Sequence, residues 1–123
     1  MSRKILIVED DPVGRHVLHT FLRQQNYDTI LVSDVTAALN QARTQHPDAV
    51  ILDLGLPAGG GFTFLERIRI FPALSVIPVI VVSGLDAEAN EPRTRALGAR
   101  EYLQKPASNE AILEAIEKVL GGR

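Results

Sequence analysis

The feature that most constrains the fold of this chain is a regular alternation of short apolar runs with segments of helical period. The runs are rich in Val and Ile and mostly too continuous for a strand with one solvated face, which is typical of strands covered on both sides. The five runs lie at residues 4–8, 28–32, 48–53, 78–83 and 101–104. This alternation predicts an α/β fold in which a doubly wound parallel sheet carries helices on both faces.

Apolar residues at helical spacing mark four of the segments between and after these runs. The stripes consist of Val13, Val17, Leu18 and Phe21; Ala38, Leu39 and Ala42; Phe62, Leu65 and Ile68; and Ile112, Leu113, Ile116, Val119 and Leu120. Asp34 or Ser33 is placed to cap the second helix and Ser108 to cap the last, which Gly121 and Gly122 end.

The segment between the fourth and fifth runs fits the helical pattern less well. Pro92 inside a helix would remove a hydrogen bond and clash with the preceding turn. The sequence therefore favours Pro92 in the first turn of a short helix capped by Asn90 or Glu91, with residues 84–90 as a long mobile loop. Five strands and five helices fill the 123 residues as one domain, residues 1–123.

Composition excludes several classes of function. A net charge of -2 gives no broad basic field, so direct binding of nucleic acid is not expected. The chain has no cysteine, which excludes disulfides and thiolate metal sites, and no apolar run approaches the roughly 18 residues of a membrane span. The apolar run after the N-terminal "MSRK" is too short for a signal peptide, so we expect a cytoplasmic protein without membrane contact.

Polar residues follow the predicted strands at their carboxyl ends, where open α/β sheets bind ligands. They are Glu9, Asp10 and Asp11 after the first strand, Asp53 at the end of the third, Ser83 at the end of the fourth and Lys105 after the fifth. Several carboxylates without cysteine or histidine beside them form a site for a hard cation such as Mg²⁺, whose natural companion is a phosphoryl group.

Phosphoryl chemistry gives these side chains distinct roles. The carboxylate of Asp53 can act as a nucleophile and form an aspartyl phosphate, while Lys105 and Ser83 supply a cation and a donor to the phosphoryl oxygens. Asp11 precedes Pro12 and is better suited to cap the helix that begins there than to bind the metal. His16 and His19 are three residues apart on the first helix and, without a third ligand, are surface residues.

Four stretches also resemble the signatures of a known family. "ILIVEDDP", "VILDLGLP", "VIVVSG" and "GAREYLQKP" are similar, in order and separation, to those of the receiver domain of two-component response regulators, of the chemotaxis-regulator type. The resemblance covers the whole chain. It implies a (βα)5 three-layer sandwich of the flavodoxin-like type, with a five-stranded parallel sheet of order 2-1-3-4-5.

The resemblance implies a role for each site residue. Asp53 matches the acceptor of a phosphoryl group from a phosphohistidine on a sensor histidine kinase or phosphotransfer protein. The Mg²⁺ ligands would be Glu9, Asp10, Asp53 and the backbone carbonyl of Gly55. Lys105, before a cis peptide at Pro106, matches the lysine that pairs with the phosphoryl group.

The family's switch is also represented in the sequence. Ser83 matches the hydroxyl residue that follows the phosphoryl group, and Tyr102 the aromatic residue that then swings inward. The resemblance implies that phosphorylation alters the surface of the fourth helix, fifth strand and fifth helix for a downstream protein or fused output domain. A homodimer through that surface is an open alternative.

Some residues depart from the family's pattern. Ala107 follows "KP", where Phe is common. Gly55 and Leu85 occupy the positions whose side chains flank the attacking water, and neither is polar, so we expect slow autodephosphorylation. The run of glycines at residues 59–61 is not a phosphate loop, because no Lys-Ser or Lys-Thr follows it, and a flexible lead into the third helix is expected.

Two other functions are compatible with this fold. A phosphatase of the haloacid dehalogenase type is disfavoured, because its nucleophile should end the first strand and Asp53 ends the third. A receiver-like interaction module that is never phosphorylated remains the main alternative. The intact site set argues against it and for a phosphoacceptor, which is no classical enzyme and at most promotes its own phosphorylation and slow dephosphorylation.

Overall fold

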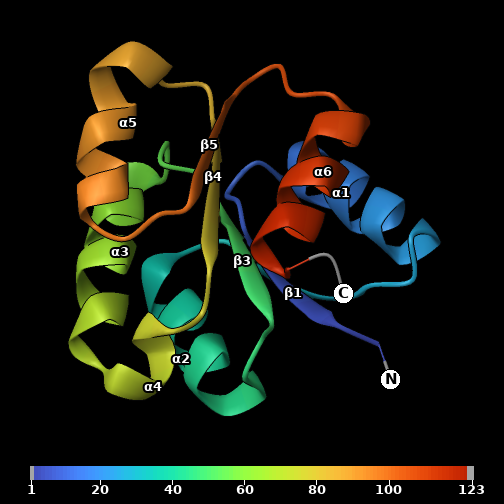
Figure 1. The fold of residues 1–123 in the computed structure, drawn as a ribbon, viewed down its shortest axis with the longest axis horizontal. Helices are drawn as coiled ribbons and strands as arrows, with labels where there is room; N and C mark the ends of the chain where they lie inside the picture. Colours follow the sequence, from blue (N-terminus) through green and yellow to red (C-terminus); the bar gives the residue numbers. More distant parts are fainter. Residues whose placement is uncertain (1, 122–123) are drawn as a thin grey trace.

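The computed structural model describes residues 2–121 and forms a three-layer α/β sandwich around a parallel sheet (Figure 1). The strands are β1 (Lys4–Val8), β2 (Asp28–Val32), β3 (Ala49–Leu52), β4 (Val79–Ser83) and β5 (Glu101–Gln104). Their order across the sheet is β2-β1-β3-β4-β5, and every neighbouring pair is parallel. The predicted fold class, strand order and strand positions are confirmed, with β3 and β4 shorter than the apolar runs that predicted them.

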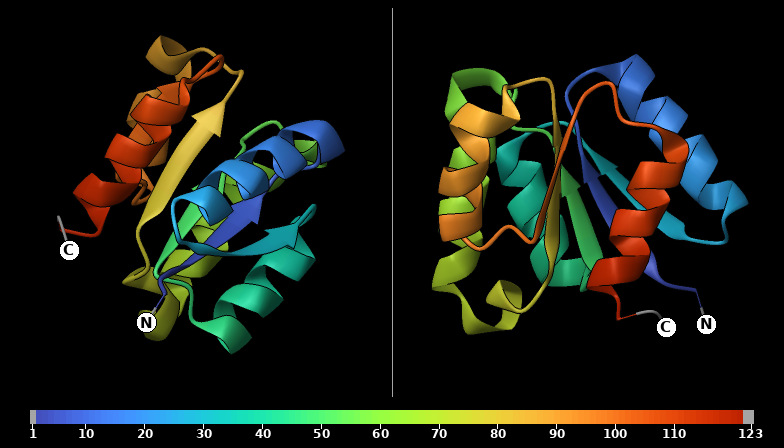
Figure 2. Two further views of the ribbon diagram at one scale, coloured as in Figure 1. Left: turned by 90° about the vertical axis from the view of Figure 1, so that its right-hand side faces the viewer. Right: turned by 45° about the horizontal axis from the view of Figure 1, so that its top comes forward.

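Helices cover both faces of the sheet (Figures 1 and 2). They are α1 (Pro12–Gln24), α2 (Val35–Gln45), α3 (Gly60–Ile70), α4 (Pro72–Ser75), α5 (Ala87–Ala96) and α6 (Asn109–Val119), with a 3-10 turn at Pro57–Gly59. On one face α1 and α6 pack against the sheet, and α2, α3, α4 and α5 pack on the other. The single turn α4 and the 3-10 turn were not predicted. Among residues 2–121, no helix combines the length and apolar character that crossing a membrane requires.

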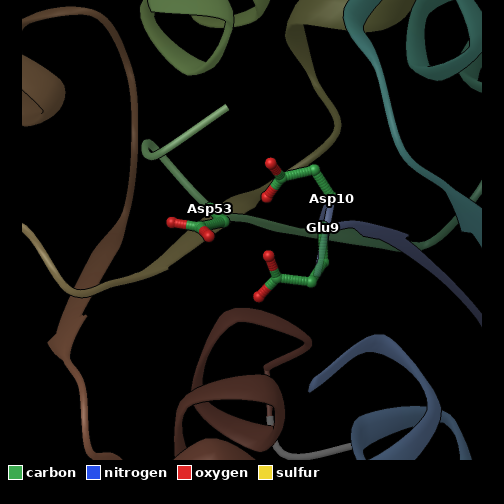
Figure 3. A group of neighbouring side chains, drawn as sticks. All are labelled: Glu9, Asp10 and Asp53. Atoms are coloured by element: carbon green, nitrogen blue, oxygen red, sulfur yellow. The ribbon is translucent and has the colours of Figure 1, made fainter. Parts of the chain in front are cut away.

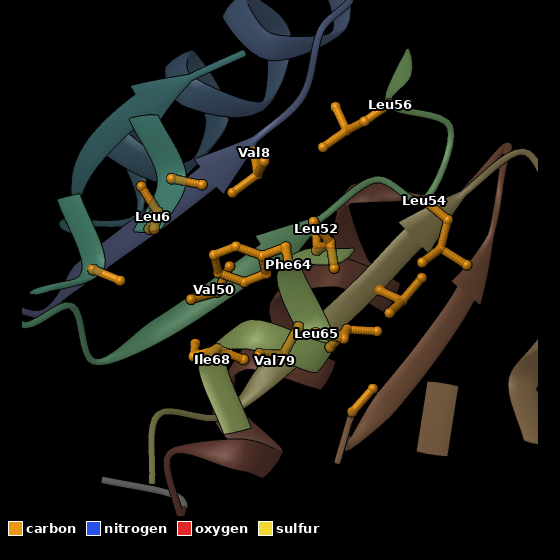
Figure 4. Close-up of a cluster of buried hydrophobic side chains, with 14 of the residues drawn as sticks. Leu6, Val8, Val50, Leu52, Leu54, Leu56, Phe64, Leu65, Ile68 and Val79 are labelled. Atoms are coloured by element: carbon orange, nitrogen blue, oxygen red, sulfur yellow. The ribbon is translucent and has the colours of Figure 1, made fainter. Parts of the chain in front are cut away.

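Successive side chains of the central strand β1 point to opposite faces of the sheet, and both faces are covered by helices, so all of its buried side chains are apolar. Ile5 and Ile7 pack under α1 and α6, whereas Leu6 and Val8 pack with α2 and α3 in the larger core (Figure 4). The edge strand β2 differs, because most of its residues are only partly buried and Leu31 is exposed. The expectation of full burial is therefore wrong for this strand, and also for the other edge strand β5, where only Tyr102 is buried.

Side-chain caps fix the start of four helices. The capping residues are Asp11, Asp34, Asp86 and Ser108, which accept hydrogen bonds from the amides of Gly14, Ala37, Ala89 and Ala111. The predicted caps at Asp11 and Ser108 are confirmed, and Asp34 rather than Ser33 caps α2. Gly121 adopts a φ of 75° just after α6, while Gly122 lies outside the described residues.

The position of Pro92 corrects the sequence analysis. Asp86 caps α5, so the helix begins at Ala87 and Pro92 lies in its interior. The predicted long loop at residues 84–90 is wrong, and so is the placement of Pro92 in a first turn. The carboxylate of Asp86 accepts the Ala89 amide, and the Asn90 side chain donates to the Asp86 carbonyl, so local capping stabilises a start that the proline rule alone does not predict.

The packing of α1 also differs from the expectation. The stripe predicted for α1 includes Val13 and Val17, which are 69% and 57% exposed. Instead α1 is anchored by Leu22, which is fully buried, with Leu18 and Phe21 beside it. Helical spacing marks a face of the helix, but it does not determine how far along the helix that face is covered.

The glycines at the start of α3 serve close packing rather than flexibility. A Cβ added at Gly61 would lie 2.6 Å from the Cα of Leu54 and 3.0 Å from the carbonyl oxygen of Asp53. One added at Gly60 would lie 2.8 Å from a methyl group of Val35. The predicted flexible lead is therefore wrong at these two buried positions, where α3 approaches the backbone that carries Asp53.

Candidate functional site

The candidate site forms where β1 and β3 end side by side (Figure 3). The pairing of Val8 with Leu52 brings the next residues of the two strands, Glu9 and Asp53, to the same edge of the sheet. The amide of Asp53 donates to the carbonyl of Val8 at 3.0 Å, which fixes this register at the site. Glu9, Asp10 and Asp53 each offer a carboxylate oxygen, and these atoms all lie within 4.8 Å of one another.

Burial distinguishes the three acids. Glu9 and Asp53 are 7% and 8% exposed, whereas Asp10 lies at the surface. The ammonium of Lys105 lies 2.6 Å from Glu9 Oε1 and 3.3 Å from Asp53 Oδ2, so it bridges the two buried carboxylates. This cation offsets part of their mutual repulsion and of the cost of removing them from water.

The pKa values of these groups respond to burial and to one another. Burial raises the pKa of Glu9, as does sharing a hydrogen bond with Asp53. Burial also opposes ionisation of Asp53, but hydrogen bonds with Glu9 and the Gly55 amide, together with Lys105, hold the pKa of Asp53 below its usual value. For Lys105, burial is outweighed by Glu9 and the charge of Asp53, which raise its pKa. The surroundings therefore favour the ionised form of Asp53 more than that of Glu9.

Backbone donors hold the acids in place. The Gly55 amide donates to Asp53 Oδ1 at 2.9 Å, and the Asp11 amide donates to Glu9 Oε2 at 3.3 Å. The Arg15 guanidinium donates to the carbonyl of Glu9 at 2.9 Å and so ties α1 to the end of β1. Sequence reasoning missed Arg15, whose only signal is its place one turn after the Asp11 cap, on the helix that follows the acids.

The structure links Ser83 to Tyr102 through one residue. Ser83 is fully buried, and its Oγ accepts the Leu85 amide at 3.2 Å. The hydroxyl of Tyr102, also buried, donates to the carbonyl of Leu85 at 2.8 Å. The start of the β4–α5 connection therefore contacts both residues that the sequence assigned to the switch. The peptide between Lys105 and Pro106 is cis, as expected.

The donor set fits Mg²⁺. Three carboxylates that each contribute an oxygen within a short span are hard ligands of the kind that Mg²⁺ and Ca²⁺ prefer. Asp11 is not one of them, because its carboxylate caps α1. His16 and His19 are not part of this cluster, and the ring of His19 instead pairs with the hydroxyl of Thr29. The Gly55 amide contacts the site by donating to Asp53. That the Gly55 carbonyl binds Mg²⁺ stays a prediction.

A cleft of about 560 Å³ opens beside the acids, between α1 and α6. Asp53 and Lys105 line its polar side, and Val17, Ala107 and Ile112 line its apolar side. The exposed valines of α1 thus border the candidate site. The cleft therefore reaches Asp53 and Lys105 along an apolar surface.

Comparisons with known proteins agree with this geometry. The response regulator receiver domain family matches residues 5–117. The polar-differentiation response regulator DivK of Brucella ovis is 31% identical over 121 residues, which are 98% of each chain. Protein PilH of Pseudomonas aeruginosa is 32% identical over 119 residues, covering 97% of this chain and 98% of PilH.

Solved structures show the same likeness. A putative response regulator from Chloroflexus aurantiacus superposes with a TM-score of 0.92 at 26% identity, covering 98% of this chain and 99% of that one. The receiver domain of sensor histidine kinase PA1611 from Pseudomonas aeruginosa, with a magnesium ion coordinated in its active-site cleft, gives a TM-score of 0.89 at 28% identity over 98% and 99% of the two chains. The chain belongs to the response regulator receiver domain family of two-component signalling.

Proposed function

We propose that this protein is a phosphorylation-activated switch that accepts a phosphoryl group onto Asp53 from a phosphohistidine of a sensor histidine kinase or phosphotransfer protein. The observation that carries the proposal is the buried Asp53 carboxylate, held beside Glu9, Asp10 and Lys105 at one edge of the sheet. Burying a carboxylate at the end of a strand costs free energy. A reactive site explains why the chain keeps this buried charge beside two other acids and a lysine better than a carboxylate without a function does.

The transfer requires one bond to form and one to break. A carboxylate oxygen of Asp53 attacks phosphorus, the bond between phosphorus and the donor imidazole nitrogen breaks, and the electron pair stays on the imidazole, which takes up a proton. The ammonium of Lys105, 3.3 Å from Asp53 Oδ2, provides a cation for the incoming phosphoryl oxygens. We assign to the hydroxyl of Ser83 the role of hydrogen-bond donor to the same phosphoryl group. The Gly55 amide holds the Asp53 carboxylate in position.

Glu9, Asp10, Asp53 and the backbone carbonyl of Gly55 are the residues that would hold Mg²⁺. When bound, the ion supplies positive charge to the phosphoryl oxygens and relieves the repulsion among the acids. The clustered carboxylate oxygens and the magnesium ion in the cleft of the PA1611 receiver domain both support this assignment.

The output of the switch is assigned to the surface of α5, β5 and α6. Tyr102 lies on β5, and its hydroxyl contacts Leu85 next to Ser83, so a shift of Ser83 toward a phosphoryl group changes a contact of Tyr102. A downstream protein or a fused output domain reads this surface, a second copy of the chain is an alternative occupant, and neither nucleic acid nor a membrane is a direct partner. We place the protein in the cytoplasm, as one domain over residues 1–123 that turns over no separate substrate.

Chemical trapping tests the assignment of the acceptor. The protein is incubated with acetyl phosphate and Mg²⁺ and then reduced with borohydride, which converts an acyl phosphate into an alcohol. Peptide mass spectrometry should find homoserine at position 53. Asp48, which lies just before β3 and whose carboxylate accepts a hydrogen bond from the Lys4 amide, is the matched control, and Asp48→Ala should leave trapping unchanged. Trapping at another acid would contradict the assignment.

Hydrogen exchange tests the output surface. Phosphorylated and unphosphorylated protein are compared in Mg²⁺, and protection should change in α5 and β5 in wild type but much less in Tyr102→Leu. A phosphorylated protein with unchanged exchange in both elements would leave Asp53 as the acceptor and refute the proposed output surface.

A further inference from the structure

A second groove lies on the face of the molecule opposite α1 and α6, between α2 and the corner where α3 meets α4. Its volume is about 1120 Å³, twice that of the cleft beside Asp53, and none of the proposed Mg²⁺ ligands line it. One wall includes Asp34, Leu39, Arg43 and His46 of α2 and its caps, and the other includes Arg67, Phe71 and Leu74. Figure 1 shows α2 beside α3 and α4 at this place.

The groove follows the length of α2. It extends from the N-cap residue Asp34 to the C-cap residue His46. An α-helix rises about 1.5 Å per residue, so this distance is roughly 18 Å, or a little over three helical turns. Such a length suits an elongated occupant better than a compact metabolite.

Exposed apolar residues lie around the α3–α4 corner, and one of them, Phe71, lines the groove, whereas Ile70 lines a separate hollow with Leu97. Ile70, Phe71 and Val76 are 71%, 54% and 69% exposed, and they make up three of the seven exposed large apolar residues in the part of the chain that the structure describes. Phe71 lines the groove directly, above the half-buried Leu39 and the buried Leu74. An exposed aromatic side chain that lines a groove with apolar residues is typical of a surface that another molecule covers.

The charges of the groove are unbalanced and unevenly placed. Arg43 and Arg67 are exposed, and neither takes part in any of the ion pairs found within residues 2–121. Arg43 and His46 lie at the C-terminal end of α2, while Asp34 lies at the other end with its carboxylate used to cap the helix. In a chain whose net charge is -2, this local positive charge favours an acidic occupant.

We propose that this groove binds an amphipathic helix of a partner protein, which lays an apolar stripe against Leu39, Phe71 and Leu74 and directs acidic side chains toward Arg43 and Arg67. Helix-in-groove recognition uses apolar anchors spaced over two to three turns, which matches the length of the groove. The site is separate from Asp53, so the partner binds whether or not the phosphoryl group is present.

Fluorescence anisotropy with designed probes tests this proposal. The first probe is a labelled peptide of about 14 residues with Leu at one helical stripe and Glu elsewhere, and the second has Lys in place of each Glu. Wild type should bind the Glu peptide saturably, with a dissociation constant on the order of 10–100 μM, at least tenfold more tightly than the Lys peptide. The double variant Arg43→Glu, Arg67→Glu should reverse that preference.

Two single variants locate the binding surface. Phe71→Ser should weaken binding of the Glu peptide at least fivefold, whereas Val13→Ser, which removes a more exposed apolar side chain from α1, should not change it. Far-UV circular dichroism verifies that each variant is folded. Repeating the titration with Asp53→Ala separates this result from the proposed phosphoryl transfer, which that variant abolishes while the groove stays intact.

Three outcomes would overturn the proposal. They are no saturable binding of the Glu peptide to folded wild type, equal binding of the two peptides, and loss of binding in Val13→Ser but not in Phe71→Ser. Sedimentation velocity provides an independent check, because a wild-type dimer that dissociates in Phe71→Ser would show that a second copy of the chain covers the groove.

Discussion

At the scale of single residues, Asp53 and Glu9 combine burial with opposite shifts in pKa. Lys105 contacts both carboxylates, while the Gly55 amide donates only to Asp53. The surroundings therefore lower the pKa of Asp53, whereas burial and the neighbouring Asp53 raise the pKa of Glu9. Asp10 differs from both, because it is exposed and lies at the mouth of the site.

The charge of Asp10 should be unfavourable until a cation binds. We predict that Asp10→Asn raises the melting temperature in EDTA, because it removes repulsion with Glu9 and Asp53, and that it loses most of the stabilisation by Mg²⁺. Wild type should gain roughly 1.4 kcal/mol when Mg²⁺ is tenfold above its dissociation constant. Thermal denaturation followed by circular dichroism, in EDTA and in MgCl₂, measures both effects.

Asp11→Asn is the matched control for this experiment. Asparagine caps a helix about as well as aspartate, and Asp11 is not part of the carboxylate cluster, so this variant should keep the full response to Mg²⁺. Equal stabilisation of Asp10→Asn and wild type by Mg²⁺ would rule out Asp10 as a ligand.

Because Gly55 has no side chain to orient water near Asp53, we predict that the phosphoryl group is long-lived. A Cβ added at Gly55 would lie 3.3 Å from Asp53 Oδ1, so a polar side chain placed there would reach the surroundings of the acceptor. We predict that Gly55→Asn shortens the phosphoryl half-life several-fold by orienting water for hydrolysis. The decay of phosphorylated protein after removal of acetyl phosphate, followed by intact mass, gives the half-life.

Gly84→Asn provides the comparison, because a Cβ at Gly84 meets no atom within 4 Å and adds a side chain without contacting the acceptor. Its half-life should equal that of wild type. A wild-type half-life of seconds in Mg²⁺ would refute the idea that an apolar surrounding slows hydrolysis.

At the scale of elements, the approach of α3 to the end of β3 sets the shape of the site. Gly61 lies against Leu54 and the carbonyl of Asp53 so closely that no side chain fits between them. The start of α3 therefore supports the backbone segment that carries Asp53. This role explains why a glycine stands in the first turn of α3.

We predict that Gly61→Ala lowers the free energy of unfolding by about 1–3 kcal/mol, because the new methyl group overlaps the backbone of Leu54. Gly84→Ala, with open space around its Cβ, should change it by less than about 0.5 kcal/mol. Urea denaturation followed by circular dichroism measures both variants. Equal stability of the two would show that α3 can withdraw from β3 at little cost.

The interior proline of α5 makes this helix less stable than its neighbours. Pro92 has no amide to donate to the preceding turn, and α5 contains one fully buried residue, Thr94. We predict that Pro92→Ala raises the free energy of unfolding by about 1–2 kcal/mol, less than the full cost of an interior proline because the unfolded chain becomes more flexible. Hydrogen exchange should show increased protection within α5.

Pro72 offers a control of the same chemistry. It stands at the first position of α4, where no helical hydrogen bond is lost, so Pro72→Ala should be neutral or slightly destabilising. A destabilising effect of Pro92→Ala would indicate that the proline stabilises α5 in a way that helix propensity does not describe.

At the scale of the whole molecule, the sheet and its reactive edge could be predicted from sequence because each depends on local pattern. Continuous apolar runs specify buried parallel strands, and the rule for their carboxyl ends brings Glu9, Asp53 and Lys105 together without further information. Their convergence in the structure is therefore the strongest agreement between the sequence and the fold.

The features that escaped prediction depend on contacts between distant segments or on competing local effects. The packing of Gly61 against Leu54 is invisible in a run of glycines, and the spacing of Val13 and Val17 does not reveal that α6 leaves them uncovered. For α5, the Asp86 cap outweighed the expected effect of Pro92, since one interior proline costs a helix hydrogen bond but does not prevent the helix from starting earlier.

The central claim is that Asp53 accepts a phosphoryl group in a reaction that depends on Mg²⁺. Intact mass spectrometry after incubation with acetyl phosphate, with Mg²⁺ or with EDTA, tests it on wild type and Asp53→Ala. A single phosphoryl adduct that requires Mg²⁺ and is absent from the folded variant is the predicted result. No adduct on folded wild type in Mg²⁺ would contradict the account and favour a receiver-like interaction module that is never phosphorylated.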